Sequence, residues 1–140
     1  MQHFSLTLTS ERSSVREARA TIRLHLDACG LTPYSDITEL LVSELVTNAL
    51  CHGSGAIRLS LSIRPRTLHC EVRDGSPRIP GVRTARHDEE SGRGLFLVQE
   101  LAHEWGSQVS DTGKAVWFNL ELSSPAGRGE SAPSSSDRPW

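Results

Sequence analysis

The chain lacks the features that mark membrane-spanning, secreted and nucleic-acid-binding proteins. It has no apolar run of the ~18 residues that a transmembrane helix requires, and residues 1–10 lack the basic and apolar segments of a secretory signal. Basic and acidic residues nearly cancel, 15 against 17, so electrostatics favours neither nucleic acid nor a membrane surface as a partner. With 36% apolar and 23% charged residues, the composition is typical of a globular protein. We expect a cytoplasmic location.

The sequence also has too few cysteines for a disulfide framework or a cysteine metal site. Cys29, Cys51 and Cys70 are odd in number and lie far apart, which excludes CxxC spacing. His52 and His69 each adjoin a cysteine, but neighbouring residues of a strand point to opposite faces and do not chelate one ion. We therefore expect reduced, packed thiols and no cysteine–histidine metal site.

Hydrophobic periodicity predicts alternating groups of strands and helices. The first helix is expected to be capped by Ser13 or Ser14 and closed by Gly30. Strands are predicted at residues 4–9, 57–63, 68–72, 107–110 and 114–122, and helices at residues 14–30, 36–51 and 92–102.

This order of elements predicts an α+β two-layer sandwich. Consecutive strands joined by tight turns indicate a mixed, mostly antiparallel sheet, and three helices suffice to cover one of its faces. A chain of 140 residues corresponds to about one domain. We assign the domain to residues 1–122 and expect residues 123–140, rich in Ser, Pro and Gly, to form a disordered tail.

The second predicted helix carries two polar residues that depart from its pattern. Glu44 and Asn48 fall on or beside the apolar stripe, one turn apart on one helix face. Either Glu44 caps a nearby backbone group or pairs with an arginine, or both residues line a cleft. In a cleft, Asn48 offers a hard oxygen to Mg²⁺ and Glu44 acts as a general base. The stripe itself comprises Ile37, Leu40, Leu41, Leu45 and Ala49.

Two further segments suit a ligand. Asp74 follows a strand, where its carboxylate can accept a hydrogen bond from an exocyclic amine, although Asp-Gly is also an ordinary turn. Gly92 and Gly94 precede a helix, whose N-terminus favours phosphate, although they also fit a plain turn. The loop between these segments is longer than typical connections, as in many active-site lids. Taken together, the three segments predict a nucleotide pocket between helices and sheet.

At these positions the chain resembles the GHKL ATPase superfamily, and most closely its branch of small anti-sigma factor serine/threonine kinases. The resemblance covers residues 4–122 and implies the Bergerat, or histidine-kinase-like ATPase, fold. It rests on four ordered segments: ELLVSELVTNA at 39–49, VRDGSPRIP at 72–80, GRGLFLV at 92–98 with Trp105-Gly106, and GKAVWF at 113–118.

The resemblance implies a role for individual residues. Glu44 would be the general base, Asn48 would hold Mg²⁺, and Asp74 would bind the adenine amino group. Phosphoryl transfer depends mainly on positioning and charge neutralisation, so such a set suffices. The residues implied to bind ATP are Asn48, Asp74, Ser76, Gly92, Arg93, Gly94 and Leu95.

The implied function is that of a Mg-ATP-dependent protein serine/threonine kinase of anti-sigma factor type. Such a protein phosphorylates a small antagonist protein and sequesters a sigma factor, and by analogy it forms a homodimer. The alternative is an ATP-binding regulator that sequesters its partner with little or no kinase activity. The chain departs from the family pattern at Ser76 and Arg78, which replace glycines, and at Ala115, where many relatives have threonine. If that threonine supports the adenine-binding aspartate, Ala115 predicts weaker nucleotide binding.

Overall fold

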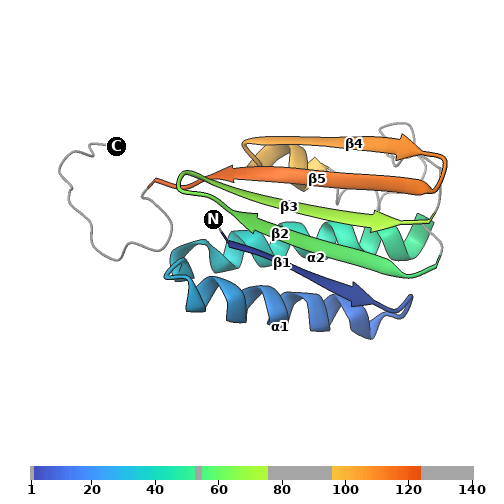
Figure 1. Cartoon of the computed structure of the whole chain (residues 1–140), viewed down its shortest axis with the longest axis horizontal. Coiled ribbons are helices and arrows are strands. Elements are labelled where there is room, and N and C mark those ends of the chain that lie inside the picture. Colours follow the sequence, from blue (N-terminus) through green and yellow to red (C-terminus); the bar gives the residue numbers. More distant parts are fainter. Residues whose placement is uncertain (1, 53–54, 76–95, 124–140) are drawn as a thin grey trace.

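The computed structural model describes residues 2–52, 55–75 and 96–123. Their strands form one five-stranded sheet in the order β1-β2-β3-β5-β4, shown in Figure 1. Every neighbouring pair is antiparallel. The strands are β1 (Gln2–Leu8), β2 (Ile57–Ile63), β3 (Thr67–Asp74), β4 (Glu104–Ser110) and β5 (Gly113–Glu121).

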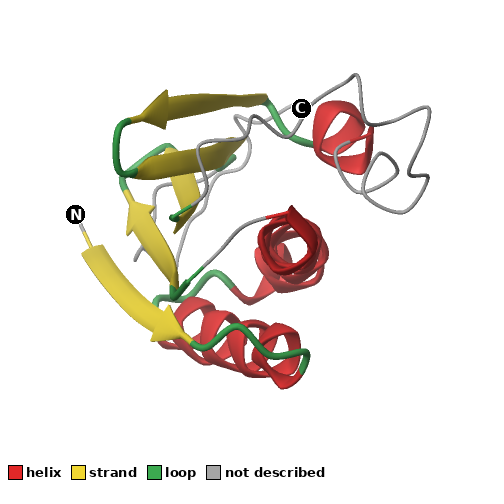
Figure 2. Ribbon diagram, turned by 90° about the vertical axis from the view of Figure 1, so that its right-hand side faces the viewer, coloured by secondary structure: helices red, strands yellow, loops and turns green. Residues whose placement is uncertain are grey.

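All described helices lie on one face of this sheet (Figure 2). They are α1 (Ser13–Ala28), the short 3-10 helix η1 (Thr32–Tyr34), α2 (Ser35–His52) and a helical segment at residues 96–101. This arrangement confirms the predicted two-layer α+β sandwich with an antiparallel sheet.

The core lies between the sheet and the two long helices. In β2 the alternating residues Ile57, Leu59, Leu61 and Ile63 are buried and the residues between them are half-buried or exposed. Leu68, Cys70 and Val72 of β3 continue this apolar layer, and Leu41, Leu45 and Ala49 of α2 lie among the same buried residues. Each buried large apolar side chain stabilises the fold by about 1.5–3 kcal/mol, so the predicted period of two determines which strand face meets the helices.

The structure corrects two predictions about the helices. Ser13 and Ser14 do not cap α1: its N-cap is Arg12, which makes no side-chain capping hydrogen bond. Ser14 Oγ instead donates to the Thr9 carbonyl oxygen at 2.7 Å, which ties the helix to the end of β1. Leu40, assigned to the apolar stripe of α2, is 38% exposed. The glycine at the end of α1 is confirmed, since Gly30 has a φ of 76°.

Strand β4 begins three residues earlier than periodicity predicts. It is an edge strand whose residues are mostly exposed, so its burial does not alternate. Its position follows from pairing with β5, where Gly106 lies opposite Trp117. A Cβ at Gly106 would lie 2.7 Å from the Trp117 ring, so a glycine is needed beneath the indole.

Three further predictions concern the cysteines, membrane-spanning helices and the C-terminal tail. Cys29, Cys51 and Cys70 are free thiols, as expected, but only Cys70 is fully buried; Cys29 is half-buried and Cys51 is exposed, so the prediction of packed thiols is wrong for Cys51. Burial raises the pKa of the Cys70 thiol. The described helices are too short or too polar to cross a lipid bilayer. Of the predicted tail at residues 123–140, only Ser123 is described; its backbone N–H donates to the Tyr34 hydroxyl at 2.8 Å.

Candidate functional site

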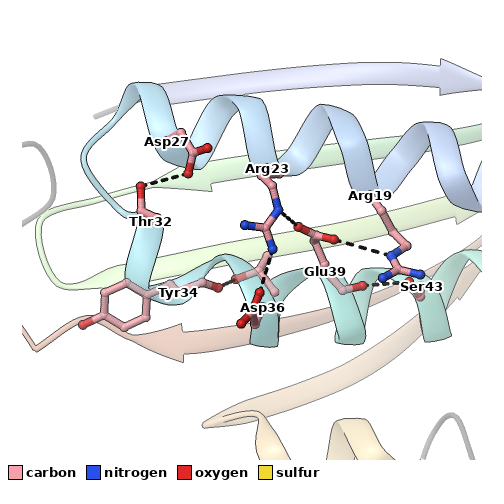
Figure 3. Close-up of polar contacts among 9 residues, drawn as sticks. Arg19, Arg23, Asp27, Thr32, Tyr34, Asp36, Glu39 and Ser43 are labelled. Carbon is pink, nitrogen blue, oxygen red and sulfur yellow. Dashed lines mark hydrogen bonds and ion pairs between the residues drawn. The ribbon is translucent and has the colours of Figure 1, made fainter.

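The first half of α2 is fixed against α1 by a cluster of ion pairs (Figure 3). Glu39 is 8% exposed, and its carboxylate pairs with Arg23 and, at 3.5 Å, with Arg19. Arg23 also donates to Asp36 at 2.6 Å. The hydrogen bonds to Asp36 and Glu39 raise the pKa of the Arg23 guanidinium. A carboxylate paired with arginines is therefore present on α2 at Glu39.

The second half of α2 carries the two residues predicted to act on the nucleotide. Glu44 is half-buried and Asn48 is 3% exposed. Among the described residues, no group hydrogen-bonds to Nδ2 of Asn48. An unsatisfied buried polar group costs about 1–3 kcal/mol, and native proteins keep few of them. The Asn48 amide is thus a buried polar group suited to a ligand.

The third predicted residue, Asp74, ends β3 at the edge of the core. Its register partner on β5 is Lys114, and Lys114 Nζ lies 2.8 Å from Asp74 Oδ2. The Lys114 side chain is 1% exposed and the Asp74 side chain is 2% exposed. Directly opposed residues of antiparallel strands share one sheet face. Because the next pair on that face, Val72 and Val116, is buried in the core, the ion pair lies on the helix side.

Lys114 was not among the predicted site residues, although the sequence carries a signal for it. Lys114 begins the alternation that continues with Val116, Phe118 and Leu120, and this alternation places it on the buried face. An unpaired lysine there is costly, so the pattern predicts an acidic neighbour. Only the strand order identifies that neighbour, because β5 pairs with β3 across 40 residues of sequence.

The structure also corrects the expectation attached to Ala115. Ala115 lies opposite Arg73, so it faces away from the helices, whereas Asp74 and Lys114 face toward them. A threonine hydroxyl at position 115 would project from the opposite sheet face. Ala115 therefore does not weaken support for Asp74, and the side chain that contacts Asp74 is Lys114.

Gly113 fixes the pairing of β3 with β5 beside this ion pair. It has a φ of +145°, and a Cβ added there would lie 2.0 Å from the Asp74 carbonyl oxygen. The close backbone approach excludes any side chain at this position. Asp74 and Lys114 are consequently brought together by a register that the backbone itself fixes.

A cavity of about 180 Å³ lies where β3 ends and β5 begins. Asp74, Gly75, Gly113 and Lys114 are among its lining residues. Its volume is below the ~300–1,000 Å³ of typical ligand pockets, so this cavity alone is too small to hold a whole nucleotide. Two larger hollows, of about 440 and 460 Å³, are lined by residues of α1, of α2 and of the segment before α1, and neither includes Asp74 or Asn48.

The remaining predicted site residues lie outside the described ranges: Ser76, Gly92, Arg93, Gly94 and Leu95. Within those ranges no three acidic, histidine or cysteine side chains gather as a metal site. Mg²⁺ is commonly held by one or two protein groups together with substrate phosphates. A single asparagine oxygen at Asn48 is compatible with that kind of coordination.

Comparisons with known proteins identify the family of the chain. The family model for the histidine kinase-like ATPase domain matches residues 8–120. An anti-sigma F factor from Geobacillus stearothermophilus is 31% identical over 118 residues, which is 73% of this chain and 78% of that protein.

Solved structures share the fold. The RsbU and RsbW domains of a Mycobacterium tuberculosis protein match with a TM-score of 0.63 and 18% identity, over 90% of this chain and 33% of that one. A histidine kinase domain from Erythrobacter litoralis matches with a TM-score of 0.54 and 24% identity, over 79% of this chain and 60% of that one. Fold, motif order and sequence identity lead to one conclusion: the chain belongs to the histidine kinase-like ATPase family and is related to the anti-sigma F factors.

Proposed function

We propose that this protein binds Mg-ATP and acts as a regulatory protein serine/threonine kinase of anti-sigma factor type. In this proposal it phosphorylates a small antagonist protein and sequesters a sigma factor. The observation that carries the proposal is Asn48, a buried amide whose Nδ2 donor has no hydrogen-bond partner among the described residues and so suits an acceptor oxygen of a ligand. It lies one helical turn after Glu44 in a chain related to anti-sigma F factors.

In the proposed site, each described residue has a separate task. Asn48 would hold Mg²⁺ through its side-chain oxygen, and the bound ion would neutralise phosphate charge. Asp74 would accept a hydrogen bond from the adenine amino group. The phosphates themselves would lie at Gly92, Arg93 and Gly94, and near Ser76, which are outside the described residues.

Glu44 would act on the protein substrate. As the serine or threonine oxygen bonds to the γ-phosphorus and the bond to ADP breaks, the Glu44 carboxylate would take the hydroxyl proton. Its half-buried position at the second half of α2 is compatible with contact to a bound hydroxyl. This reaction needs no further catalytic group from the described residues.

One observation favours a second candidate, a regulator that sequesters its partner with little or no kinase activity. Asp74 is already engaged by Lys114 in a buried ion pair, so an adenine base has to share this carboxylate. The homodimer and the cytoplasmic location stay predictions in either case.

Calorimetric titration of the whole protein with Mg-ATP tests the proposal. We expect micromolar to sub-millimolar binding that Asn48→Ala removes, because the variant loses the only side-chain oxygen at this position. Glu39→Gln is the matched control on the same helix and should bind as the wild type does. Absence of binding to the wild-type protein would make the sequestering regulator the better account, and unchanged binding by Asn48→Ala would remove Asn48 from the metal site.

A further inference from the structure

The ion pair between Asp74 and Lys114 is deeply buried. Its net contribution to the stability of the fold is nevertheless small, because burying the two charges is costly. Both side chains are at most 2% exposed, and Nζ lies 2.8 Å from Oδ2. Removing two charges from water costs several kcal/mol per ion, so apolar replacements of such pairs are often neutral or stabilising. Stability alone gives little reason to place a lysine here.

The position of the pair suggests a role in ligand binding. Asp74 is the last residue of β3, and both side chains line the cavity of about 180 Å³. The register that joins them is fixed by the close approach of Gly113 to the Asp74 carbonyl. Lys114 is therefore held at one carboxylate oxygen by the backbone of two paired strands.

The chemistry of the two groups separates their tasks. An ammonium group has three donors and no acceptor, so Lys114 cannot accept a bond from an amino group. An ionised carboxylate has about four acceptor positions. A bond from Lys114 to Oδ2 is thus compatible with a second bond from a base to the same carboxylate, and it limits the directions in which the carboxylate can turn.

We propose that Lys114 is a positioning residue for base recognition: it holds the Asp74 carboxylate in place and thereby sets how strongly the site prefers a 6-aminopurine to a purine without that amino group. The inference rests on the proposed function, because it requires that a purine nucleotide binds at Asp74. In this inference the preference for a 6-aminopurine depends on both Asp74 and Lys114 and not on Asp74 alone.

Dissociation constants for Mg-ATP and for the Mg complex of purine riboside triphosphate test the inference. Purine riboside lacks only the 6-amino group, so the ratio of the two constants isolates the contact made by that group. A hydrogen bond to a charged group predicts a preference of about tenfold or more for ATP in the wild-type protein. In Lys114→Met the ratio should fall to below about threefold, as expected when the acceptor is no longer held in place.

Arg23→Met is the matched control. Arg23 is also an ion-paired cation, with Asp36 as its partner at 2.6 Å, but it lies on α1 and does not line the cavity at Asp74. The Arg23→Met variant should therefore show the wild-type ratio. Circular dichroism and the thermal midpoint report whether each variant is folded. Should Lys114→Met fail to fold, Lys114→Leu, which likewise has no side-chain donor, takes its place, with the same expected fall in the ratio.

The outcomes distinguish the inference from the proposed function. A folded Lys114 variant that binds ATP with the wild-type ratio would overturn the inference and leave the proposed function intact. A wild-type protein that binds neither nucleotide would overturn both. A ratio that falls equally in Arg23→Met would also overturn the inference, because loss of any ion-paired cation would then explain the change.

Discussion

The two halves of α2 use buried polar groups in different ways. In the first half, Glu39 is 8% exposed and its carboxylate is paired with Arg19 and Arg23. In the second half, Asn48 is 3% exposed and its Nδ2 has no partner among the described residues. A satisfied buried charge fixes one helix against another, whereas an unsatisfied amide costs stability. The difference supports a structural role for the first half of α2 and the proposal that its second half contributes to the nucleotide site.

The largest expected effect is on the rate of phosphoryl transfer, which should depend on Glu44 and not on Glu39. Glu44→Ala should lower the rate of phosphoryl transfer by about 10²–10⁴-fold, the usual contribution of a general base, and leave the Mg-ATP dissociation constant unchanged. Transfer of labelled γ-phosphate from ATP to the antagonist protein measures the rate. Glu39→Gln should transfer phosphate at the wild-type rate. A Glu44→Ala variant with full activity would show that Glu44 is not the base.

The next effect concerns stability. Glu39→Gln should lower the free energy of unfolding by about 1 kcal/mol, since its partners are half exposed and solvent screens such pairs. Urea denaturation followed by circular dichroism gives this value. Asp36→Asn is the matched control: the Asp36 side chain is 95% exposed, so its loss should be smaller. Equal losses in the two variants would contradict a special role for the buried carboxylate.

The smallest effect is expected at Ala115. Ala115→Thr adds a hydroxyl on the sheet face opposite to Asp74, so the Mg-ATP dissociation constant should stay within about twofold of the wild-type value, a change well below the worth of one hydrogen bond. Calorimetry on the two proteins is sufficient. A tenfold gain in affinity would mean that the strand does not present residue 115 as its register indicates.

Local patterns predicted most of the fold because they report burial directly. The burial of β2 follows from its apolar alternation, and the end of α1 follows from the positive φ that Gly30 adopts. Strand β4 was predicted three residues too short because an exposed edge strand has no apolar alternation. The N-terminus of α1 was misplaced because Ser14 bonds to Thr9 and not to its own helix.

The site was less predictable because its contacts depend on strand order. Glu44, Asn48 and Asp74 depart from their local patterns, so sequence alone could single them out. Lys114 could be placed on a buried face but not next to Asp74, since that contact requires β5 to lie between β3 and β4. The same register places Ala115 on the sheet face opposite to Asp74, so the effect predicted for Ala115 on nucleotide binding no longer follows.

The thermal shift produced by Mg-ATP in three proteins tests the division of α2 most directly. A ligand at 100 times its dissociation constant stabilises the folded state by about 2.7 kcal/mol, which raises the thermal midpoint measurably. The account predicts an upward shift for the wild type and for Glu39→Gln, which starts from a lower midpoint, and no shift for Asn48→Ala. A shift in Asn48→Ala equal to that of the wild type would contradict the assignment of the second half of α2 to the nucleotide site.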